Sequence, residues 1–213
     1  MRTTFIASGD SFITRHVAKD GYDGFDALCD LIGKYDVRFA NLEMTFHRQE
    51  GYPSATSGGT WAMTDPTMLD DMLRYGFNIF NTANNHSGDF GQGGVSATIR
   101  HLNERKMVFA GTGNTLQEAS RACYLETREA RVALIGVTAT LDPAAIAGGQ
   151  GGDMIGRPGL NPCASRRFIM SMPSTSPWLK HCQTSPRSTR VQNKKLEMVT
   201  SIRSPKARCR WAI

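Results

Sequence analysis

The sequence lacks the cysteine patterns that hold many small domains together. Its five cysteines are odd in number and widely spaced, and no Cys-x-x-Cys pair occurs among them. This spacing argues against a disulfide framework and against a structural zinc knuckle. We therefore expect free thiols.

Long apolar runs are also missing. No stretch of about 18 or more apolar residues occurs, which is the length that a membrane-spanning helix needs. The first six residues are too short and too polar for the apolar region of a secretory signal. We predict no membrane segment and no export, and hence a cytoplasmic protein.

Residues 161–213 lack glycine, aspartate and tyrosine altogether, although the whole chain has 21 glycines. They hold 11 Lys and Arg against one Glu, whereas residues 1–160 hold 14 Lys and Arg against 18 Asp and Glu. The formal net charge of +6 therefore arises from the tail alone. The composition predicts an organised domain over residues 1–160 and a disordered basic tail over residues 161–213.

What the first 160 residues do contain is an alternation of strand-like and helix-like patterns. Short apolar runs at 3–8, 36–42, 77–82 and 107–110 are separated by helical apolar spacing that begins near residues 23, 64 and 95. This order predicts an α/β fold with a largely parallel sheet and helices on its faces. Two further strand-like runs are expected at 124–126 and 131–137, a short helix at about 115–122, and polar loops at 44–59 and 148–159; His16 and His47 are expected in solvated loops.

Three polar clusters come directly after predicted strands: Gly9-Asp10, Asn41-Leu42-Glu43 and Asn84-Asn85-His86. The carboxyl ends of parallel strands share one edge of the sheet, so the clusters should converge in one crevice. Two carboxylates, an amide oxygen and an imidazole make a ligand set for Mg or Mn, with nitrogen enough for Zn or Fe. Each cluster alone would serve equally well as a turn, because Asn and Asp side chains bond locally to the backbone.

The residue types suit phosphoester hydrolysis. A carboxylate shared by two metal ions about 3.5–4 Å apart offsets their charge, and the pair holds the attacking oxygen and the substrate in line. An amide oxygen ligates without adding negative charge, and a histidine beside the ions can protonate a leaving oxygen. One divalent ion, or two, is the cofactor that these clusters imply.

The segments SGDSFI, ANLEMTF, TANNHSGDFGQGG, FAGTGN, VALIGVTAT and RPGLNP resemble the CapA family of capsule or poly-gamma-glutamate biosynthesis proteins, whose fold resembles the calcineurin-like metallophosphoesterases. The resemblance covers about residues 2–162. It implies Asp10 and Glu43 as metal ligands, with Glu43 as a candidate bridge, Asn85 as a ligand of the second metal, and His86 as the acid beside the leaving group. The predicted substrate-binding residues are Asn84, which also shapes its turn, Thr112, Asn114 and Arg157.

The Gly-Thr-Gly-Asn stretch at 111–114 could present backbone amides to a phosphate, but a plain helix cap before Thr115 is the favoured interpretation.

The sequence departs from the family after about Pro162. Members continue into further Gly-His and His-Trp segments, whereas His181 is the one histidine beyond residue 101 here and the tail has no glycine. We expect an incomplete sheet, in a chain that is truncated or frame-shifted at that point.

The leading functional prediction is a metal-dependent hydrolase, or a transferase, of this pathway that acts on an anionic or phosphorylated small molecule or polymer. The alternatives are a catalytically incompetent fragment or scaffold and, less favoured, a nucleic-acid-binding protein that uses the cationic tail with Trp178 and Trp211. The oligomeric state stays open.

Overall fold

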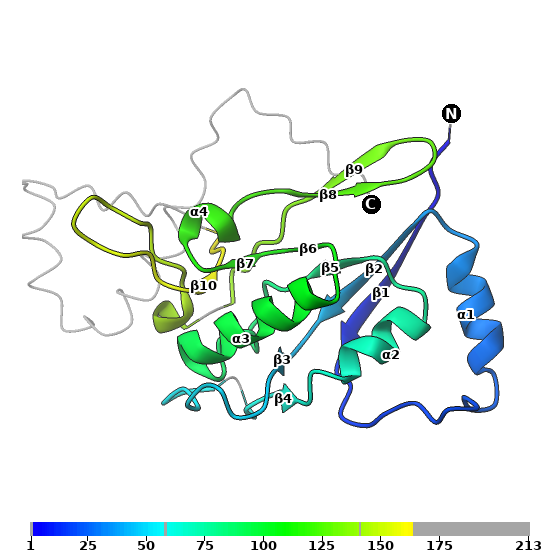
Figure 1. The fold of residues 1–213 in the computed structure, drawn as a ribbon, viewed down its shortest axis with the longest axis horizontal. Coiled ribbons are helices and arrows are strands. Elements are labelled where there is room, and N and C mark those ends of the chain that lie inside the picture. Colours follow the sequence, from blue (N-terminus) through cyan, green and yellow to red (C-terminus); the bar gives the residue numbers. More distant parts are fainter. Residues whose placement is uncertain (1, 58, 141, 164–213) are drawn as a thin grey trace, which may run out of the picture. The chain divides into compact units, whose positions relative to one another are not determined.

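A computed structural model of the chain describes residues 2–57, 59–140 and 142–163 (Figure 1). The predicted tail lies almost wholly outside these residues. The elements, in chain order, are β1 (Phe5–Ser11), α1 (Phe25–Gly33), β2 (Val37–Leu42), β3 (Thr45–Phe46), β4 (Met63–Thr64), α2 (Met68–Arg74), β5 (Ile79–Asn81), α3 (Gly91–Glu104), β6 (Phe109–Ala110), β7 (Thr112–Gly113), α4 (Leu116–Ala119), β8 (Cys123–Glu126), β9 (Arg131–Leu134), a 3-10 turn (Pro143–Ala145) and β10 (Gly159–Leu160).

A four-stranded parallel sheet organises the described residues (Figure 1). Its strand order is β1-β2-β5-β6, and every neighbouring pair is parallel. Each of the three helical connections moves one strand in the same direction. Right-handed crossovers of this kind place α1, α2 and α3 on one face of the sheet. The predicted α/β class with a parallel sheet and flanking helices is confirmed.

The hydrophobic core lies between this face of the sheet and the helices. Ala40 of β2 and Phe80 of β5 are fully buried there. Because side chains alternate along a strand, Asn41 and Asn81 point to the opposite face. The core cluster is made of Ala40, Leu42, Met44, Phe46, Ala62, Met68, Leu69, Met72, Phe80, Leu102 and Met107.

The first strand runs further than its sequence pattern predicts. The apolar pattern ends at Ser8, but β1 continues through Gly9 and Asp10 to Ser11. A register shift between Ala7 and Asp10 explains the difference, because β1 advances three residues there while β2 advances two. This irregularity brings Asp10 opposite Asn41 of β2, within the strand rather than after it.

The later strand-like runs do not extend the parallel sheet. β8 and β9 pair with each other as an antiparallel hairpin, with Cys123 opposite Leu134 and Glu126 opposite Arg131. The charged turn that the sequence places between them joins the two strands. β7 and β10 form a second small antiparallel pair, and β3 and β4 a small parallel one.

The expectation that His47 lies in a solvated loop is wrong. Only 1% of His47 is exposed, because the polar segment after β2 first forms β3 and packs over α3. Its Nδ1 accepts a hydrogen bond of 3.2 Å from the backbone N–H of Glu50. Its Nε2 is buried without a hydrogen-bond partner among the described residues, and its ring meets that of Phe90 edge-on at 4.9 Å.

Burial lowers the pKa of His47, and the nearby His101 lowers it further, whereas Glu50 raises it. A histidine pKa below its unfolded value of about 6.5 means that the unfolded chain binds the proton more tightly. We expect the free energy of unfolding to keep this contribution above about pH 6.5 and to lose it as the pH falls, with a slope of at most about 1.4 kcal/mol per pH unit. Urea titrations between pH 5 and 8 measure the slope.

A His47→Gln variant provides the comparison, since its amide does not titrate but can still accept a hydrogen bond. The difference in unfolding free energy between wild type and variant should change with pH below about 6.5. A difference that stays constant over the whole range would show that His47 does not titrate on unfolding.

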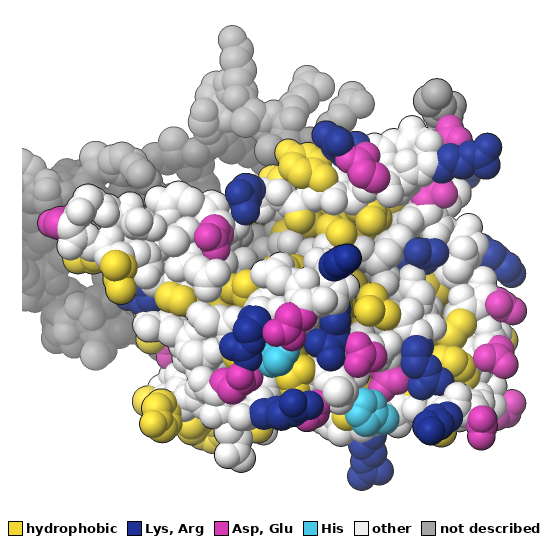
Figure 2. Space-filling view, viewed as in Figure 1, with side chains coloured by type: hydrophobic (Ala, Val, Ile, Leu, Met, Phe, Trp, Pro, Cys, Tyr) yellow, Lys and Arg dark blue, Asp and Glu magenta, His cyan; other side chains and the backbone are white. Residues whose placement is uncertain are grey.

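Acidic and basic side chains are interspersed over the face shown in Figure 2. Oppositely charged side chains pair at several places in the described residues, including Arg48 with Asp65, Arg100 with Glu50, and Arg105 with Asp70. Such mixing of both signs does not make a basic stripe of the kind that tracks a nucleic-acid backbone. The cationic residues of the predicted tail lie outside the described residues.

Among the described residues, the structure contains no helix of sufficient length and apolarity to span a membrane.

Candidate functional site

Asn41 is the centre of a hydrogen-bonded cluster at the carboxyl ends of the parallel strands. Its Nδ2 donates to Asp10 Oδ1 at 2.8 Å and also to Glu43 Oε2. Its Oδ1 accepts from Asn81 Nδ2 at 2.7 Å and from Asn84 Nδ2 at 3.2 Å. An asparagine amide has two donor hydrogens and two acceptor lone pairs, so all four are in use. Asn41 thereby holds two carboxylates from neighbouring strands against one nitrogen.

The two carboxylates differ in environment. Asp10 is exposed, whereas only 8% of Glu43 is exposed. Burial raises the pKa of Glu43, and the neighbouring Asp10 carboxylate raises it as well, while the Asn41 hydrogen bond and His86 lower it. A cation bound beside Glu43 would relieve the repulsion that the Asp10 carboxylate exerts on it.

His86 is fixed by a buried carboxylate three residues later. Its Nδ1 lies 2.8 Å from Asp89 Oδ2, and Asp89 is only 3% exposed. The same carboxylate oxygen accepts from the backbone N–H of Ala62 at 2.7 Å, which ties it to the segment before β4. The Phe12 ring packs edge-on against the imidazole, with centroids 5.8 Å apart. These contacts hold the imidazole by one nitrogen, and Nε2 makes no hydrogen bond to any residue that the structure describes.

Of the two asparagines before His86, Asn84 shapes the turn. Its Nδ2 donates to the Leu42 carbonyl at 2.7 Å, and its Oδ1 accepts from the backbone N–H groups of His86 and Ser87. Asn85 is exposed, and its side chain makes no hydrogen bond with the residues that the structure describes. The turn therefore presents Asn85 to solvent and uses Asn84 internally.

The remaining predicted substrate-binding residues make no hydrogen bond to Asn41 among the described residues. Thr112 is buried, and its hydroxyl lies 2.8 Å from that of Thr82. Asn114 is exposed beside the start of α4, where Thr115 caps the helix by accepting from the Glu118 N–H at 3.2 Å. Arg157 is exposed, and its Nε donates to the Ile146 carbonyl at 3.1 Å. The helix-cap interpretation of the Gly-Thr-Gly-Asn stretch thus matches the observed hydrogen bonds.

Two residues of the site, Asn81 and Asp89, were not singled out from the sequence, and Asn41 was named in its polar cluster without a role of its own. Asn41 was recognisable in principle, because alternation along a strand puts it on the same face as Glu43. Asn81 stands opposite Asn41 in the strand register. A Cβ on Gly136 would lie 2.5 Å from Asn81 Oδ1, so the chain after β9 crosses close to this asparagine.

The residues present fit a hard divalent cation better than a closed zinc site. Mg²⁺ is usually held by one or two carboxylates together with waters and substrate oxygens. Asp10 and Glu43 can supply the carboxylates. A structural zinc site takes four side-chain ligands, mostly nitrogen and sulfur. Across the part of the chain that the structure describes, no group of three or more His, Cys, Asp or Glu side chains is placed to hold a metal.

Comparison with known proteins agrees with this arrangement of motifs. The family described as "Bacterial capsule synthesis protein PGA_cap" matches residues 4–163. Two proteins of Sinorhizobium fredii, "Uncharacterized protein y4sH" and "Uncharacterized protein y4uA", are each 34% identical over 173 residues, or 80% of this chain. "Capsule biosynthesis protein CapA" of Bacillus anthracis is 33% identical over 72 residues, which is 34% of this chain and 18% of that protein.

The chain spans 38% of the length of the two Sinorhizobium relatives. The matched family covers both carboxylates, the Asn-Asn-His turn and the RPGLNP segment that carried the resemblance. The assignment to the CapA group, made from those motifs, is confirmed. The chain belongs to the bacterial capsule synthesis protein family.

Proposed function

We propose that this chain carries the metal-binding half of a phosphoesterase site of capsule or poly-gamma-glutamate biosynthesis. The substrate would be a phosphorylated or otherwise anionic compound of that pathway. The observation that supports this most strongly is the convergence of Asp10 and Glu43 on Asn41, with the His86–Asp89 pair beside them.

In this proposal, separate residues bind the metal, orient its ligands and donate a proton. Asp10 and Glu43 would hold a divalent cation, with Mg²⁺ or Mn²⁺ favoured by the oxygen donors, and exposed Asn85 would offer its amide oxygen to a second ion. When bound, such a cation polarises a phosphoryl oxygen and offsets the charge that develops on it. Asn41 keeps the two carboxylates in one orientation. His86, held through Nδ1 by Asp89, has Nε2 available to protonate the leaving oxygen.

Metal binding tests this proposal directly. The affinity of the purified chain for Mn²⁺, measured by calorimetry, should fall by at least about tenfold in Asp10→Asn, since even loss of a residue that only orients a ligand costs about 10–100-fold. Asp153→Asn removes an exposed carboxylate from the 148–159 loop and should bind as the wild type does. Hydrolysis of p-nitrophenyl phosphate should fall in parallel with metal occupancy.

A second candidate function is a scaffold that keeps half a metal site. It is favoured by the lack of a third His, Cys, Asp or Glu ligand beside Asp10 and Glu43 in the described ranges. A chain that binds no Mn²⁺, Mg²⁺ or Zn²⁺ and hydrolyses no aryl phosphate would support the scaffold and overturn the enzyme.

A further inference from the structure

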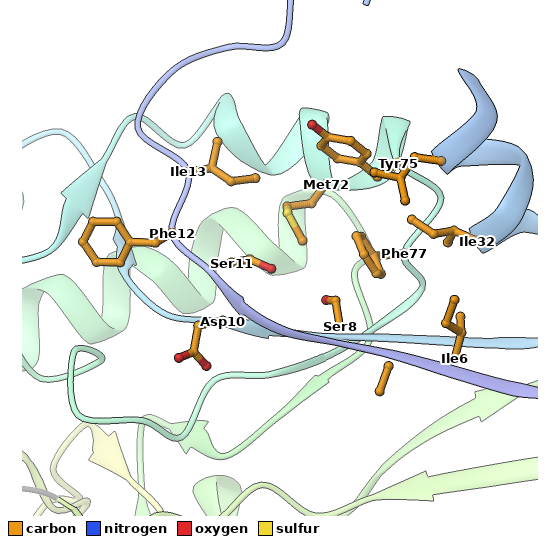
Figure 3. Close-up of a pocket in the computed structure, with 12 residues that line it drawn as sticks. Ile6, Ser8, Asp10, Ser11, Phe12, Ile13, Ile32, Met72, Tyr75 and Phe77 are labelled. Carbon is orange, nitrogen blue, oxygen red and sulfur yellow. The ribbon is translucent and has the colours of Figure 1, made fainter. Parts of the chain in front are cut away.

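An apolar groove runs along the first strand on the side of the helices (Figure 3). Its volume is about 420 Å³, which is within the range of about 300–1,000 Å³ that small-molecule pockets occupy. It lies between β1, α1 and α2. The lining residues are Ile6, Ala7, Ser8, Asp10, Ser11, Phe12, Ile13, Leu28, Ile32, Met72, Tyr75 and Phe77.

The groove meets the candidate site at one end. Asp10 and Phe12 line the groove, and both also belong to the site, since Asp10 is bonded to Asn41 and Phe12 packs on His86. Figure 3 shows the Asp10 carboxylate turned away from the apolar side chains, such as Ile13 and Phe77, across the strand. The polar side chains of the candidate site and the apolar groove thus lie on opposite sides of the carboxyl end of β1.

β1 is an edge strand of the described sheet, because the order is β1-β2-β5-β6. Large apolar side chains beside it are partly exposed, with 46% of Phe12 and 38% of Leu28 accessible. A ligand with a charged head and an apolar tail could place its head at Asp10 and Glu43 and bend around the strand end into the groove.

We propose that the groove binds the hydrocarbon part of an amphiphilic substrate, a phosphate ester of a long-chain alcohol, whose phosphate occupies the Asp10–Glu43–His86 site. This proposal rests on the proposed function, and it adds the substrate class. Apolar walls favour binding of a hydrocarbon chain because the chain is removed from water. Asp10 and Phe12, which belong to both the groove and the site, mark where the hydrocarbon chain would join the phosphate.

Alkylphosphonates test the proposal without turnover, because their carbon–phosphorus bond is not an ester. Calorimetry in the presence of Mn²⁺ would compare methyl-, butyl-, hexyl-, octyl- and decylphosphonate below the concentrations at which they form micelles. We expect affinity to rise with chain length, by up to about fourfold for each added methylene that enters the groove.

Two variants of the groove sharpen the experiment. Ser8→Phe fills the groove from a half-buried strand position, and Leu28→Gln makes its wall polar from a partly exposed helix position that should fold readily. Either variant should flatten the dependence on chain length while methylphosphonate still binds. Ala133→Phe puts the same new ring on an exposed position of β9, outside the groove, and should keep the wild-type dependence.

The outcomes separate this proposal from the proposed function. If methylphosphonate binds but longer chains bind no tighter, the groove does not bind the hydrocarbon chain, and the phosphoesterase proposal survives. If Ser8→Phe and Leu28→Gln both keep the chain-length dependence, the chain binds elsewhere and the groove is again excluded. If no phosphonate binds, including methylphosphonate, both proposals fail together.

Discussion

A His86→Ala variant should hydrolyse phosphate monoesters about 10²–10⁴-fold more slowly than the wild type, which is the range that a positioned general acid contributes. The loss should depend on the ester. Phenyl phosphate has a poor leaving oxygen that needs a proton, whereas p-nitrophenyl phosphate departs more readily without one. Steady-state kinetics on both esters, with Mn²⁺ saturating, should therefore show the larger loss for phenyl phosphate.

Two further variants define what His86 does. His101→Ala removes another histidine, which lies on α3 and pairs with Glu50 and Glu104. This variant should leave both rates unchanged. Asp89→Asn keeps the shape of the positioning residue but removes its charge, and should show a smaller loss with the same preference between esters. Equal losses on the two esters in His86→Ala would rule out proton donation and leave only a structural role.

The largest loss of stability is expected from Phe80→Ala. Phe80 is 0% exposed at the centre of β5, between Ala40 of β2 and Phe109 of β6 in the strand register. Removing a buried aromatic ring costs about 3–5 kcal/mol, through lost burial and the cavity left behind. Domains of this kind have about 5–15 kcal/mol in total, so the variant should be close to unfolding at room temperature.

Urea titration followed by circular dichroism gives the difference in unfolding free energy. Tyr52→Ala serves as the control, because Tyr52 is 92% exposed and a surface change of this kind usually stays within about 0.5 kcal/mol. A loss below about 1 kcal/mol in Phe80→Ala would mean that the ring is not packed as described. The hydrophobic cluster would then need a different centre.

Much of the sheet was predictable because its strands are short, apolar and separated by helical spacing. The run at 36–42 and its successor at 77–82 became β2 and β5, within two residues at each end. What the pattern could not give was the path of β1 beyond Ser8, since a register shift depends on the neighbouring strand. The burial of His47 was equally hidden, because it follows from tertiary packing of β3 on α3 and not from local polarity.

The sequence predicted which strand ends carry the candidate site, but it did not predict the hydrogen bonds that join its residues. Strand ends brought Asp10, Glu43 and His86 to one edge, as their order along the chain indicated. The amide that joins the carboxylates belongs to Asn41, whose importance appears only when the strands are set in register. Thr112 and Arg157 were predicted to bind substrate; the structure places the Thr112 hydroxyl inside the fold, 2.8 Å from that of Thr82, and Arg157 in a loop where it donates to the Ile146 carbonyl.

The hydrogen bonds of Asn41 also bear on how the protein folds. They reach Asp10, Asn81 and Asn84, which are 31, 40 and 43 residues away along the chain. Contacts of such long range close large loops, and the entropy lost on closing them must be offset by the packing of the intervening strands and helices. A ligand held at this point binds the folded chain alone and would stabilise it by about 2.7 kcal/mol at one hundred times its dissociation constant. An ion bound to the two carboxylates that Asn41 arranges would therefore stabilise contacts between segments that are distant in the sequence. Removing the ion with a chelator would then lower the stability of the sheet as well as the activity of the site.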